Sequence, residues 1–302
     1  MSNDLLRFSP FTLSHIHSFT REATTLHPFT HSLIHPLSDY PSHIHSFTSE
    51  ASMTISFRKR LQKGDVLIGA LVQMPLPEIA ETFVQAGYDW LFVDLEHSPM
   101  DARNALDILT AVDNRVPCVV RVPWNDEANI KKALDIGATG IVVPLVNNSE
   151  DATLAVGRCK YPPAGFRSVG ITRAQRFDLD FDAYMKRAND EIAVIVQIEH
   201  VEAVKNIDAI LDVAGIDGVF VGPFDMSGSM DLPGQINHPQ VQEAIRKVIK
   251  ACEKRDIARC IYAHTPNHAK TYLEQGYRVI GLCTDYIMLA RTAAEYLKAV
   301  RG

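Results

Sequence analysis

Polar side chains stand at the carboxyl ends of four predicted β-strands. They occur in Asp94-Leu95-Glu96-His97, at Arg121, in Gln197-Ile198-Glu199-His200 and in Gly222-Pro223-Phe224-Asp225. Carboxylates bind divalent cations, an imidazole transfers protons near neutral pH, and a guanidinium holds anions. When strands alternate with helices in a barrel, the active site forms at the carboxyl ends of the strands. We therefore expect these side chains to share one site.

Glu199 and Asp225 are the candidates for binding a metal. Gln197 and Glu199 lie two residues apart on a strand, so their side chains point to the same side, and one can ligate while the other contacts substrate. Asp225 follows a Gly-Pro turn where backbone N–H groups can face a bound anion. Two carboxylates with open coordination positions suit Mg²⁺, Mn²⁺ or Co²⁺, completed by water and a 2-oxo acid. The alternative is that both are surface charges or salt-bridge partners.

Arg121 and His97 are the candidates for chemistry on the bound molecule. Arg121 interrupts an otherwise apolar strand, and a buried guanidinium needs an anionic partner or a ligand. Two roles stay open for it: pairing with Asp94 or Glu96, or stabilising the negative oxygen that develops when a 2-oxo acid becomes an enolate. His97 opens the loop after the second strand, a suitable place for a general base.

The elements that must position these residues begin at Met53. From there, short β-rich runs alternate with amphipathic helical stretches, as in repeated βα units. The predicted strands are Val66–Met74, Trp90–His97, Cys118–Trp124, Gly140–Val146, Ala193–His200, Gly218–Met226, Ala258–Thr265 and Arg278–Asp285. The predicted helices include Pro77–Ala86, Met100–Asp113, Asp126–Ile136, Ser149–Cys159, Val201–Val213, Pro239–Arg255, Pro266–Gln275 and Tyr286–Val300.

Eight βα units in about 250 residues predict a single α/β domain, a closed (β/α)8 TIM barrel over residues 53–302. An open doubly wound sheet is disfavoured because the chain lacks the glycine fingerprint of dinucleotide-binding folds. Several predicted helices end on a glycine, which can adopt the left-handed conformation that ends a helix. These glycines are Gly87, Gly137, Gly215 and Gly276.

Residues 1–52 have a different composition, rich in His, Ser, Thr, Pro and Phe, with no helical or strand periodicity. The stretch 14–20 recurs as 42–48, and seven of the 12 histidines lie in this segment. We predict a disordered extension. A histidine-rich tract can capture metal, and the simpler interpretation is a flexible extension upstream of a natural start at Met53.

Composition excludes several classes of protein. The 302 residues carry 30 basic and 36 acidic side chains, a net charge of −6, which argues against nucleic acid as a partner. No apolar run reaches the ~20 residues needed to cross a bilayer, and the N-terminus does not follow the pattern of a signal peptide. We therefore expect a cytoplasmic protein that does not bind membranes. The five cysteines show no paired spacing, which predicts buried, reduced thiols.

From about Thr54 to its C-terminus the chain resembles the HpcH/HpaI aldolase family of class II, metal-dependent pyruvate aldolases. The resemblance lies in several motifs that are specific only together. They are Gly87-Tyr88-Asp89-Trp90, Asp94-Leu95-Glu96-His97, Trp124-Asn125-Asp126, Tyr161-Pro162-Pro163-Ala164-Gly165, Gln197-Ile198-Glu199 and Asp217-Gly218-Val219-Phe220-Val221-Gly222-Pro223.

The resemblance implies a role for each matching residue. Glu199 and Asp225 would bind the metal, and Asp225, Gln197 and the backbone at Phe224 would contact the substrate. Arg121 would stabilise the enolate. His97 would be the catalytic base, and Asp135 would raise its basicity.

The resemblance also implies assembly and points to two departures. Members of the family exchange a C-terminal helix between subunits and form hexamers built from dimers, so a homo-oligomer is expected. Phe224 stands where relatives commonly have a small residue, and Ser168 stands where glycine is usual. Both departures concern the pocket that would bind the aldehyde rather than the metal chemistry.

The implied reaction is the reversible cleavage of a 4-hydroxy-2-oxo acid into pyruvate and an aldehyde, through a metal-bound pyruvate enolate. A class I aldolase would instead need a Schiff-base lysine at a strand end, and none is available: the lysines fall on helical stretches, including Lys186, at the end of a helix (Lys160) or before the first strand. Related alternatives are a lyase for acyl-CoA thioesters of the malyl or citramalyl type and an oxaloacetate decarboxylase. A non-catalytic ligand-binding barrel is the alternative from a different class.

Overall fold

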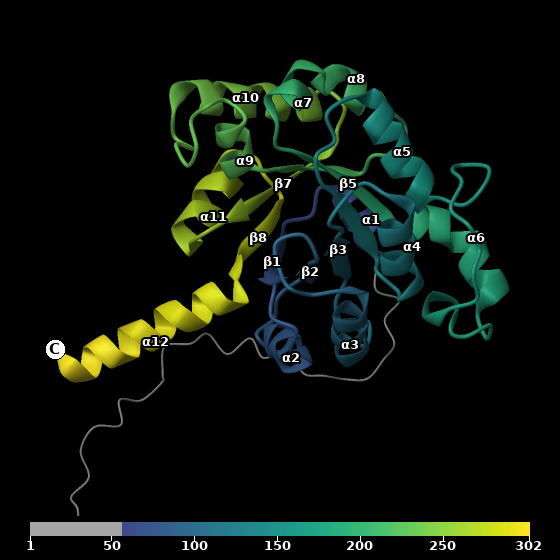
Figure 1. Ribbon diagram of the computed structural model, residues 1–302, viewed down its shortest axis with the longest axis horizontal. Helices are drawn as coiled ribbons and strands as arrows, with labels where there is room; N and C mark the ends of the chain where they lie inside the picture. Colours follow the sequence, from purple (N-terminus) through teal and green to yellow (C-terminus); the bar gives the residue numbers. More distant parts are fainter. Residues whose placement is uncertain (1–55) are drawn as a thin grey trace, which may run out of the picture. The chain divides into compact units, whose positions relative to one another are not determined.

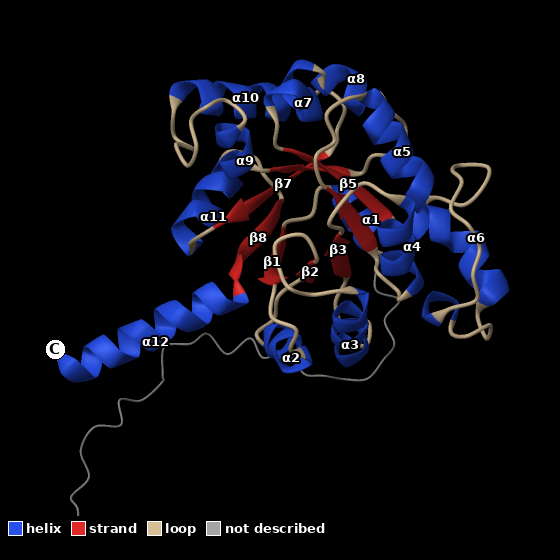
Figure 2. Ribbon diagram, in the orientation of Figure 1, coloured by secondary structure: helices blue, strands red, loops and turns tan. Residues whose placement is uncertain are grey.

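The computed structural model describes residues 56–302. The predicted disordered extension, residues 1–52, and the predicted start of the domain at residue 53 lie outside the described residues. In the described part, eight parallel strands pair in sequence order and close into a barrel, and Figure 2 shows helices around the strands. The predicted (β/α)8 fold is confirmed.

Each predicted strand is present, with ends that differ by a few residues. The strands are β1 (Leu67–Val72), β2 (Trp90–Asp94), β3 (Cys118–Arg121), β4 (Gly140–Val143), β5 (Ala193–Ile198), β6 (Gly218–Val221), β7 (Ala258–Ala263) and β8 (Val279–Thr284). They are nearly continuous apolar runs because a parallel sheet covered by helices is buried on both faces.

The helices alternate with the strands along the chain (Figure 1). They are α1 (Phe57–Lys63), α2 (Pro77–Gln85), α3 (Ala102–Val112), α4 (Glu127–Asp135), α5 (Ser149–Cys159), α6 (Phe181–Glu191), α7 (Val201–Lys205), α8 (Ile207–Leu211), α9 (Pro223–Gly228), α10 (Pro239–Glu253), α11 (Pro266–Glu274) and α12 (Asp285–Arg301), with a 3₁₀ helix, η1 (Arg173–Gln175). All four glycines predicted to end helices have positive φ, between 87° and 103°.

Three helical elements were not predicted: α1, η1 and α9; for α6 a helical stretch was expected around Lys186, without bounds. The predicted sixth strand, 218–226, was too long, because β6 ends at Val221 and the chain turns at Gly222 into α9. Pro223 has no N–H for a strand ladder but suits the first turn of a helix. The predicted helix 201–213 is divided into α7 and α8.

Two hydrophobic clusters build the core, one between strands and helices and one inside the barrel. The inner cluster includes α1, whose Phe57 and Leu61 are buried. The Phe57 ring lies 5.4 Å from that of Trp90, the first residue of β2. A side chain at Gly69 would overlap the Trp90 indole, so β1 needs a glycine there. The inner cluster and α1 therefore fill the barrel at the amino ends of the strands.

The last helix, α12, differs from the others in its burial. Figure 1 shows it projecting from the barrel, and only its first residue, Asp285, is buried. Apolar side chains on α12 are open to solvent, including Leu289 (59%), Tyr296 (73%) and Val300 (86%). Within residues 56–302 no helix has the length and hydropathy required to span a membrane. All five cysteines are buried free thiols, as predicted.

Candidate active site

The side chains that point into the barrel change from apolar to polar at the carboxyl ends of the strands. Gln73, Asp94, Arg121 and Gln197 are all at least nine-tenths buried, with exposed fractions of 7%, 0%, 7% and 1%. Strand side chains on one face alternate with a period of two. The residues two positions earlier belong to the inner hydrophobic cluster; they are Leu71, Phe92, Val119 and Ile195. A polar layer thus rests on an apolar one.

Asp94 and Arg121 form an ion pair inside this layer. Arg121 Nε donates to Asp94 Oδ1 at 2.9 Å, and Arg121 Nη2 donates to Oδ2 at 2.7 Å. Burial raises the pKa of the Asp94 carboxyl, but the hydrogen bonds and charge of Arg121 outweigh it, so this pKa lies below its ordinary value. Oδ1 also accepts the backbone N–H groups of Glu96 (3.0 Å) and His97 (3.3 Å). Asp94 therefore also orders the loop that carries His97.

The other edge of the Arg121 guanidinium faces across the barrel. Its Nη1 lies 2.9 Å from Glu96 Oε2 and 3.3 Å from Gln197 Oε1. The predicted pairing of Arg121 with Asp94 and Glu96 is therefore present. It does not exclude the second predicted role, because Nη1 remains at the open end of the barrel.

Glu199 follows β5 and is 3% exposed. Its Oε1 accepts the backbone N–H of Leu145 at 2.9 Å, and its Oε2 accepts a hydrogen bond from Gln197 Nε2. Burial raises the pKa of Glu199, the two hydrogen bonds lower it, and the negative charge of Asp225 raises it further. The Glu199 and Asp225 carboxylates therefore repel each other, which a cation between them would relieve.

Asp225 is exposed in the first turn of α9, and Gly222 brings this turn against Glu199. A Cβ at Gly222 would lie 2.8 Å from Glu199 Cβ and 3.0 Å from Oε2, too close for any side chain. Within residues 56–302, no third His, Cys, Asp or Glu joins them in a metal-binding cluster. Two carboxylates fit a hard cation that keeps positions for water and a chelating substrate, such as Mg²⁺ or Mn²⁺. The Phe224 side chain beside Asp225 is exposed (55%).

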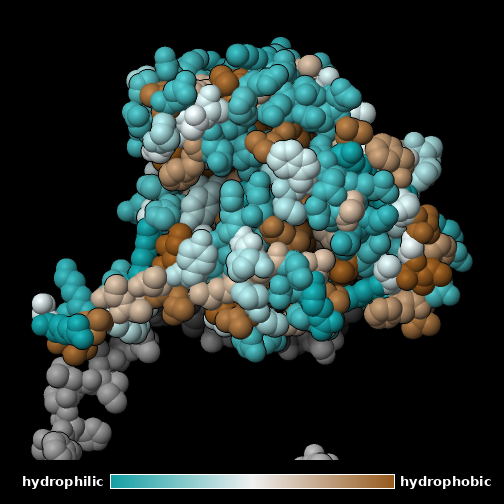
Figure 3. All heavy atoms as spheres, in the orientation of Figure 1, coloured by the Kyte–Doolittle hydropathy of each residue, from teal (hydrophilic) through white to brown (hydrophobic). Residues whose placement is uncertain are grey.

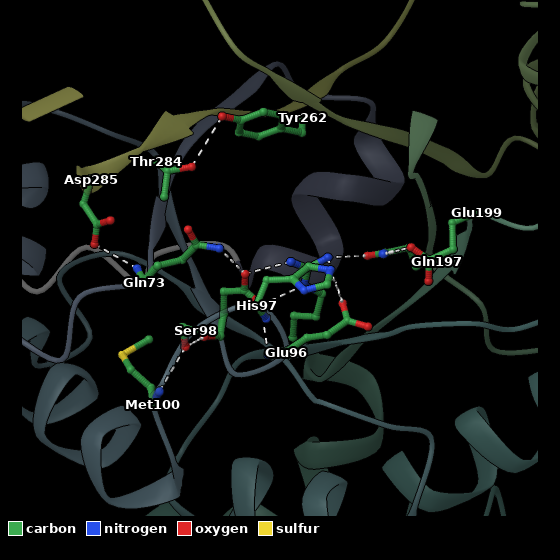
Figure 4. Close-up of polar contacts among 12 residues, drawn as sticks. Gln73, Glu96, His97, Ser98, Met100, Gln197, Glu199, Tyr262, Thr284 and Asp285 are labelled. Atoms are coloured by element: carbon green, nitrogen blue, oxygen red, sulfur yellow. Dashed lines mark hydrogen bonds and ion pairs between the residues drawn. The ribbon is translucent and has the colours of Figure 1, made fainter. Parts of the chain in front are cut away.

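Glu96 is a site residue that the sequence named only as a possible partner of Arg121. Burial raises its pKa to about 7, helped by the charges of Glu199, Asp94 and Asp225 and opposed by Arg121. Its Oε2 lies 3.9 Å from His97 Nε2, and the His97 side chain is 59% exposed. Figure 4 shows both residues facing the centre into which Gln197 and Gln73 also reach. The sequence signals for Glu96 were its place in the run that ends with His97 and its possible pairing with Arg121; neither indicated a raised pKa.

Asp135 lies elsewhere. It is the last residue of α4, which leads from β3 back to the amino end of β4, so it stands at the opposite end of the barrel from His97. Its carboxylate accepts a hydrogen bond from Arg167 Nη2 at 2.8 Å, and Arg167 stacks on Tyr161, 4.5 Å from the ring centre. The structure does not bring Asp135 and His97 together within one chain. The role of Asp135 stays a prediction from the resemblance.

Comparison with known proteins identifies a matching family and similar enzymes. Residues 69–292 match the model of the family described as HpcH/HpaI aldolase/citrate lyase. The chain is 41% identical over 253 residues to 4-hydroxy-2-oxo-heptane-1,7-dioate aldolase of Escherichia coli, covering 83% of this chain and 96% of that enzyme. The enzyme of the same name from Klebsiella pneumoniae is 42% identical over 253 residues, covering 82% and 94%.

A solved structure agrees with these matches. The crystal structure of a HpcH/HpaI aldolase/citrate lyase family protein from Burkholderia cenocepacia J2315 superposes with a TM-score of 0.79 at 35% identity. The superposition covers 81% of this chain and 98% of that protein. Sequence and structure comparisons therefore agree over the whole barrel.

Proposed function

Since the chain belongs to the HpcH/HpaI aldolase/citrate lyase family and is a carbon–carbon lyase of the aldolase type, we propose that it reversibly cleaves a 4-hydroxy-2-oxo acid into pyruvate and an aldehyde. The observation that carries the proposal is the convergence of Arg121 with Glu96, Gln197 and Glu199 at one end of the barrel. The guanidinium suits the negative oxygens of a 2-oxo acid, and the carboxylates suit a cation that such an acid chelates.

Glu199 and Asp225 would hold the divalent metal, with Mg²⁺, Mn²⁺ and Co²⁺ as the candidates. Such a cation, when bound, polarises the keto group and stabilises negative charge on its oxygen. Gln197 and the backbone at Phe224 would position the carboxylate of the substrate. Gln197 is suited to this because its amide lies between Arg121 and Glu199, so its orientation is set from both sides.

Arg121 would stabilise the charge that develops during cleavage. Its guanidinium is already held by Asp94, so it needs little reorganisation when negative charge appears. His97 removes the proton of the substrate 4-hydroxyl, and the C3–C4 bond breaks to release the aldehyde. The electron pair of that bond remains as the pyruvate enolate, whose oxygen Arg121 contacts. Protonation at C3 then gives pyruvate.

The lysines of residues 56–302 support a route without a Schiff base. The one buried lysine is Lys160, just after α5, with 3% of its surface exposed. Its Nζ donates to the backbone carbonyls of Asn189 at 2.8 Å and Ile192 at 2.6 Å, away from the carboxyl ends of the strands. A covalent imine would need a lysine amine next to the substrate carbonyl.

Two exposed apolar surfaces support the predicted homo-oligomer. One is the solvent-facing side of α12. The other is the segment between α5 and α6, where Figure 3 shows apolar side chains at the right-hand edge of the view; it exposes Phe166, Val169, Ile171, Phe177 and Leu179. Apolar patches of this kind mark contacts between proteins. In such an assembly, Asp135 of one subunit could approach only the His97 of another, because the two residues lie at opposite ends of one barrel.

The test is pyruvate release from a panel of 4-hydroxy-2-oxo acids of different length and terminal charge. We expect release with added Mg²⁺, Mn²⁺ or Co²⁺, loss in excess chelator, and recovery when metal is restored. Borohydride added during turnover should leave no covalent adduct on the protein. Activity that survives chelation, or a borohydride-trapped lysine, would favour the class I mechanism. Oxaloacetate and a malyl thioester in the same panel test the alternative substrates.

A further inference from the structure

Gln73 connects three parts of the barrel mouth. It follows β1 and is 7% exposed. Its side-chain Nε2 donates to Asp94 Oδ2 at 2.5 Å, and its backbone N–H donates to Asp285 Oδ2 at 2.8 Å. Figure 4 shows its amide directed toward the centre of the site and its backbone toward Asp285. Its Oε1 has no hydrogen-bond partner among the described residues.

The orientation of the Gln73 amide is set by Asp94. An amide has a donating and an accepting end, and an ionised carboxylate only accepts. Turning the amide over would place its oxygen against the Asp94 carboxylate, so the NH₂ group must face Asp94. The same Oδ2 accepts from Arg121 Nη2 at 2.7 Å. Gln73 and Arg121 therefore share one carboxylate oxygen, and the position of one affects the other.

Asp285 fixes the backbone that carries Gln73. It is the first residue of α12 and is 4% exposed. Its Oδ2 accepts the N–H groups of Gln73 and Met74, both at 2.8 Å, while its Oδ1 accepts the N–H of Tyr286 at 2.7 Å. A continuous chain of hydrogen bonds thus leads from the start of α12 through Gln73 and Asp94 to Arg121.

We propose that Gln73 is a positioning residue for Arg121, and that Asp285 holds Gln73 so that the start of α12 helps to set the geometry of the catalytic arginine. This proposal rests on the proposed function of Arg121. Without the Gln73 amide, Asp94 loses one of its buried donors and can rotate toward the others. Arg121 then keeps its charge and its ion pair with Asp94, but its guanidinium turns away from the substrate oxygen. Small misplacements of this kind are costly for catalysis.

The test is a double-mutant cycle between Gln73→Leu and Arg121→Lys. Gln73→Leu should lower kcat for pyruvate release about tenfold in the otherwise wild-type enzyme, as loss of an outer-shell partner typically does. In the Arg121→Lys background, whose ammonium cannot make the paired contact with Asp94, the same change should lower kcat less than about twofold. Equal fold-losses in both backgrounds, or no loss in either, would overturn the proposal.

Gln175→Leu is the matched control for the removal of a buried amide. Gln175 is 0% exposed and its Nε2 donates to the Tyr161 hydroxyl at 3.2 Å, far from the barrel mouth in η1. This variant should lose thermal stability as Gln73→Leu does, but keep its kcat. If Gln175→Leu lowered kcat as much as Gln73→Leu, the effect at Gln73 would be one of stability, and the proposal would fail.

A second readout separates this proposal from the proposed function. Oxalate, a planar dianion with the shape of an enolate of a 2-oxo acid, should bind at Arg121 whatever substrate the enzyme cleaves. In calorimetry with Mn²⁺ present, Gln73→Leu should weaken the affinity for oxalate about tenfold when residue 121 is Arg. The same change should weaken it less than about twofold in the Arg121→Lys background. Failure of wild type to release pyruvate would contradict the proposed function, while the oxalate cycle would still decide the role of Gln73.

The link to α12 has its own variant, Asp285→Asn, which keeps the size of the side chain and replaces one accepting oxygen by a donor. We expect it to lower kcat a few-fold, and to have no further effect once Gln73 is Leu, because it acts through Gln73. An independent loss in the Gln73→Leu background would show that Asp285 acts by another route, which would remove α12 from the proposal.

Discussion

The Asp94 carboxylate binds one edge of the Arg121 guanidinium through two hydrogen bonds, from Nε to Oδ1 at 2.9 Å and from Nη2 to Oδ2 at 2.7 Å. This geometry leaves Nη1 as the nitrogen that faces Glu96 and Gln197. A lysine has one compact ammonium and cannot bind a carboxylate along an edge while directing a second nitrogen elsewhere. The role of Arg121 therefore depends on its shape as well as on its charge.

Arg121→Lys should lower kcat for pyruvate release by about 10²–10³, the usual cost of losing one donor to a developing oxyanion. The barrel should stay folded, because Asp94 keeps a cationic partner. Steady-state kinetics and circular dichroism measure the two effects. Arg255→Lys is the control: Arg255 also binds carboxylates, those of Asp208 and Asp212, but at the surface. A nearly normal kcat in Arg121→Lys would reduce Arg121 to a structural ion-pair partner.

Glu199→Gln and Asp225→Asn should each weaken Mn²⁺ binding by about tenfold or more while the fold is kept, since each change preserves size and removes an anionic ligand. Both oxygens of Glu199 accept N–H groups, from Leu145 and from Gln197, so Gln at this position can keep only one of these bonds and should lower the melting temperature of the metal-free protein modestly. Titration calorimetry measures the affinity. Glu202→Gln, at an exposed position three residues later, should bind Mn²⁺ normally. Wild-type affinity in either ligand variant would remove that residue from the metal site.

The strands could be predicted because each is a short apolar run buried on both faces, and the barrel follows from their number. The end of β6 was placed wrongly although Gly222-Pro223 marks it, because apolar residues continue to Met226 and the predicted strand was extended to include them. The bounds of α6 could not be predicted, because the helix buries only Tyr184 and Ala188 and its apolar face is therefore short.

The same limit applies to the site. Arg121, Glu199 and His97 could be found because each is a polar residue at the end of an apolar strand. Gln73 could not, because its importance lies in a contact with Asp94, 21 residues away. The resemblance gave a role to Asp135, but only the structure shows that α4 carries it to the other end of the barrel. Sequence patterns locate strand ends; they do not show which side chains meet there.

Glu96 should make the metal-free protein less stable as the pH rises. Its pKa is raised to about 7 in the folded protein, so the folded state binds a proton more tightly than the unfolded chain. This stabilisation is fully present below the unfolded pKa of ~4.5 and is lost as the pH rises through ~7. Glu199, whose pKa is also raised, acts in the same direction.

Glu96→Gln should therefore reduce the fall in melting temperature between pH ~5 and pH ~7.5, because the amide stays neutral throughout. The measurement is thermal unfolding in excess chelator at a series of pH values. Glu274→Gln, at an exposed position on α11, is the control and should follow wild type. Identical pH dependence in wild type and Glu96→Gln would mean that Glu96 does not bind a proton in this range.

We predict that Asp135 acts on His97 of a second subunit. Asp135→Asn should then lower kcat less than loss of His97 does, since it removes only the partner of the imidazole. When His97→Ala and Asp135→Asn chains are co-expressed, Asp135 of the first chain can meet His97 of the second. Some subunit contacts then contain both wild-type residues, so the mixed oligomer should be more active than the average of the two variants alone. Activity equal to that average would place Asp135 in a structural role beside Arg167.

His97→Ala tests the general base. His97 lies at the mouth of the barrel, where its side chain is 59% exposed and its Nε2 stands 3.9 Å from Glu96 Oε2, so it can reach a substrate hydroxyl held above the polar layer. Removing a positioned base typically costs about 10²–10⁴ in rate. We expect a loss of that order in kcat for cleavage, measured as pyruvate release at saturating substrate. The affinity for Mn²⁺ should stay close to wild type, because Glu199 and Asp225 are untouched.

The control for this variant is His268→Ala, which removes an exposed histidine on α11 and should leave kcat unchanged. A general base must be unprotonated to act, so the rate falls at low pH where the base gains a proton. This fall in kcat at low pH should shift or disappear in His97→Ala and should remain in His268→Ala. Near-normal cleavage by His97→Ala, or loss of metal together with activity, would exclude His97 as the base. The proton would then have to pass to another group at the mouth. Glu96→Gln would be the next variant to measure, because Glu96 Oε2 lies 3.9 Å from His97 Nε2 and burial raises the pKa of Glu96 to about 7.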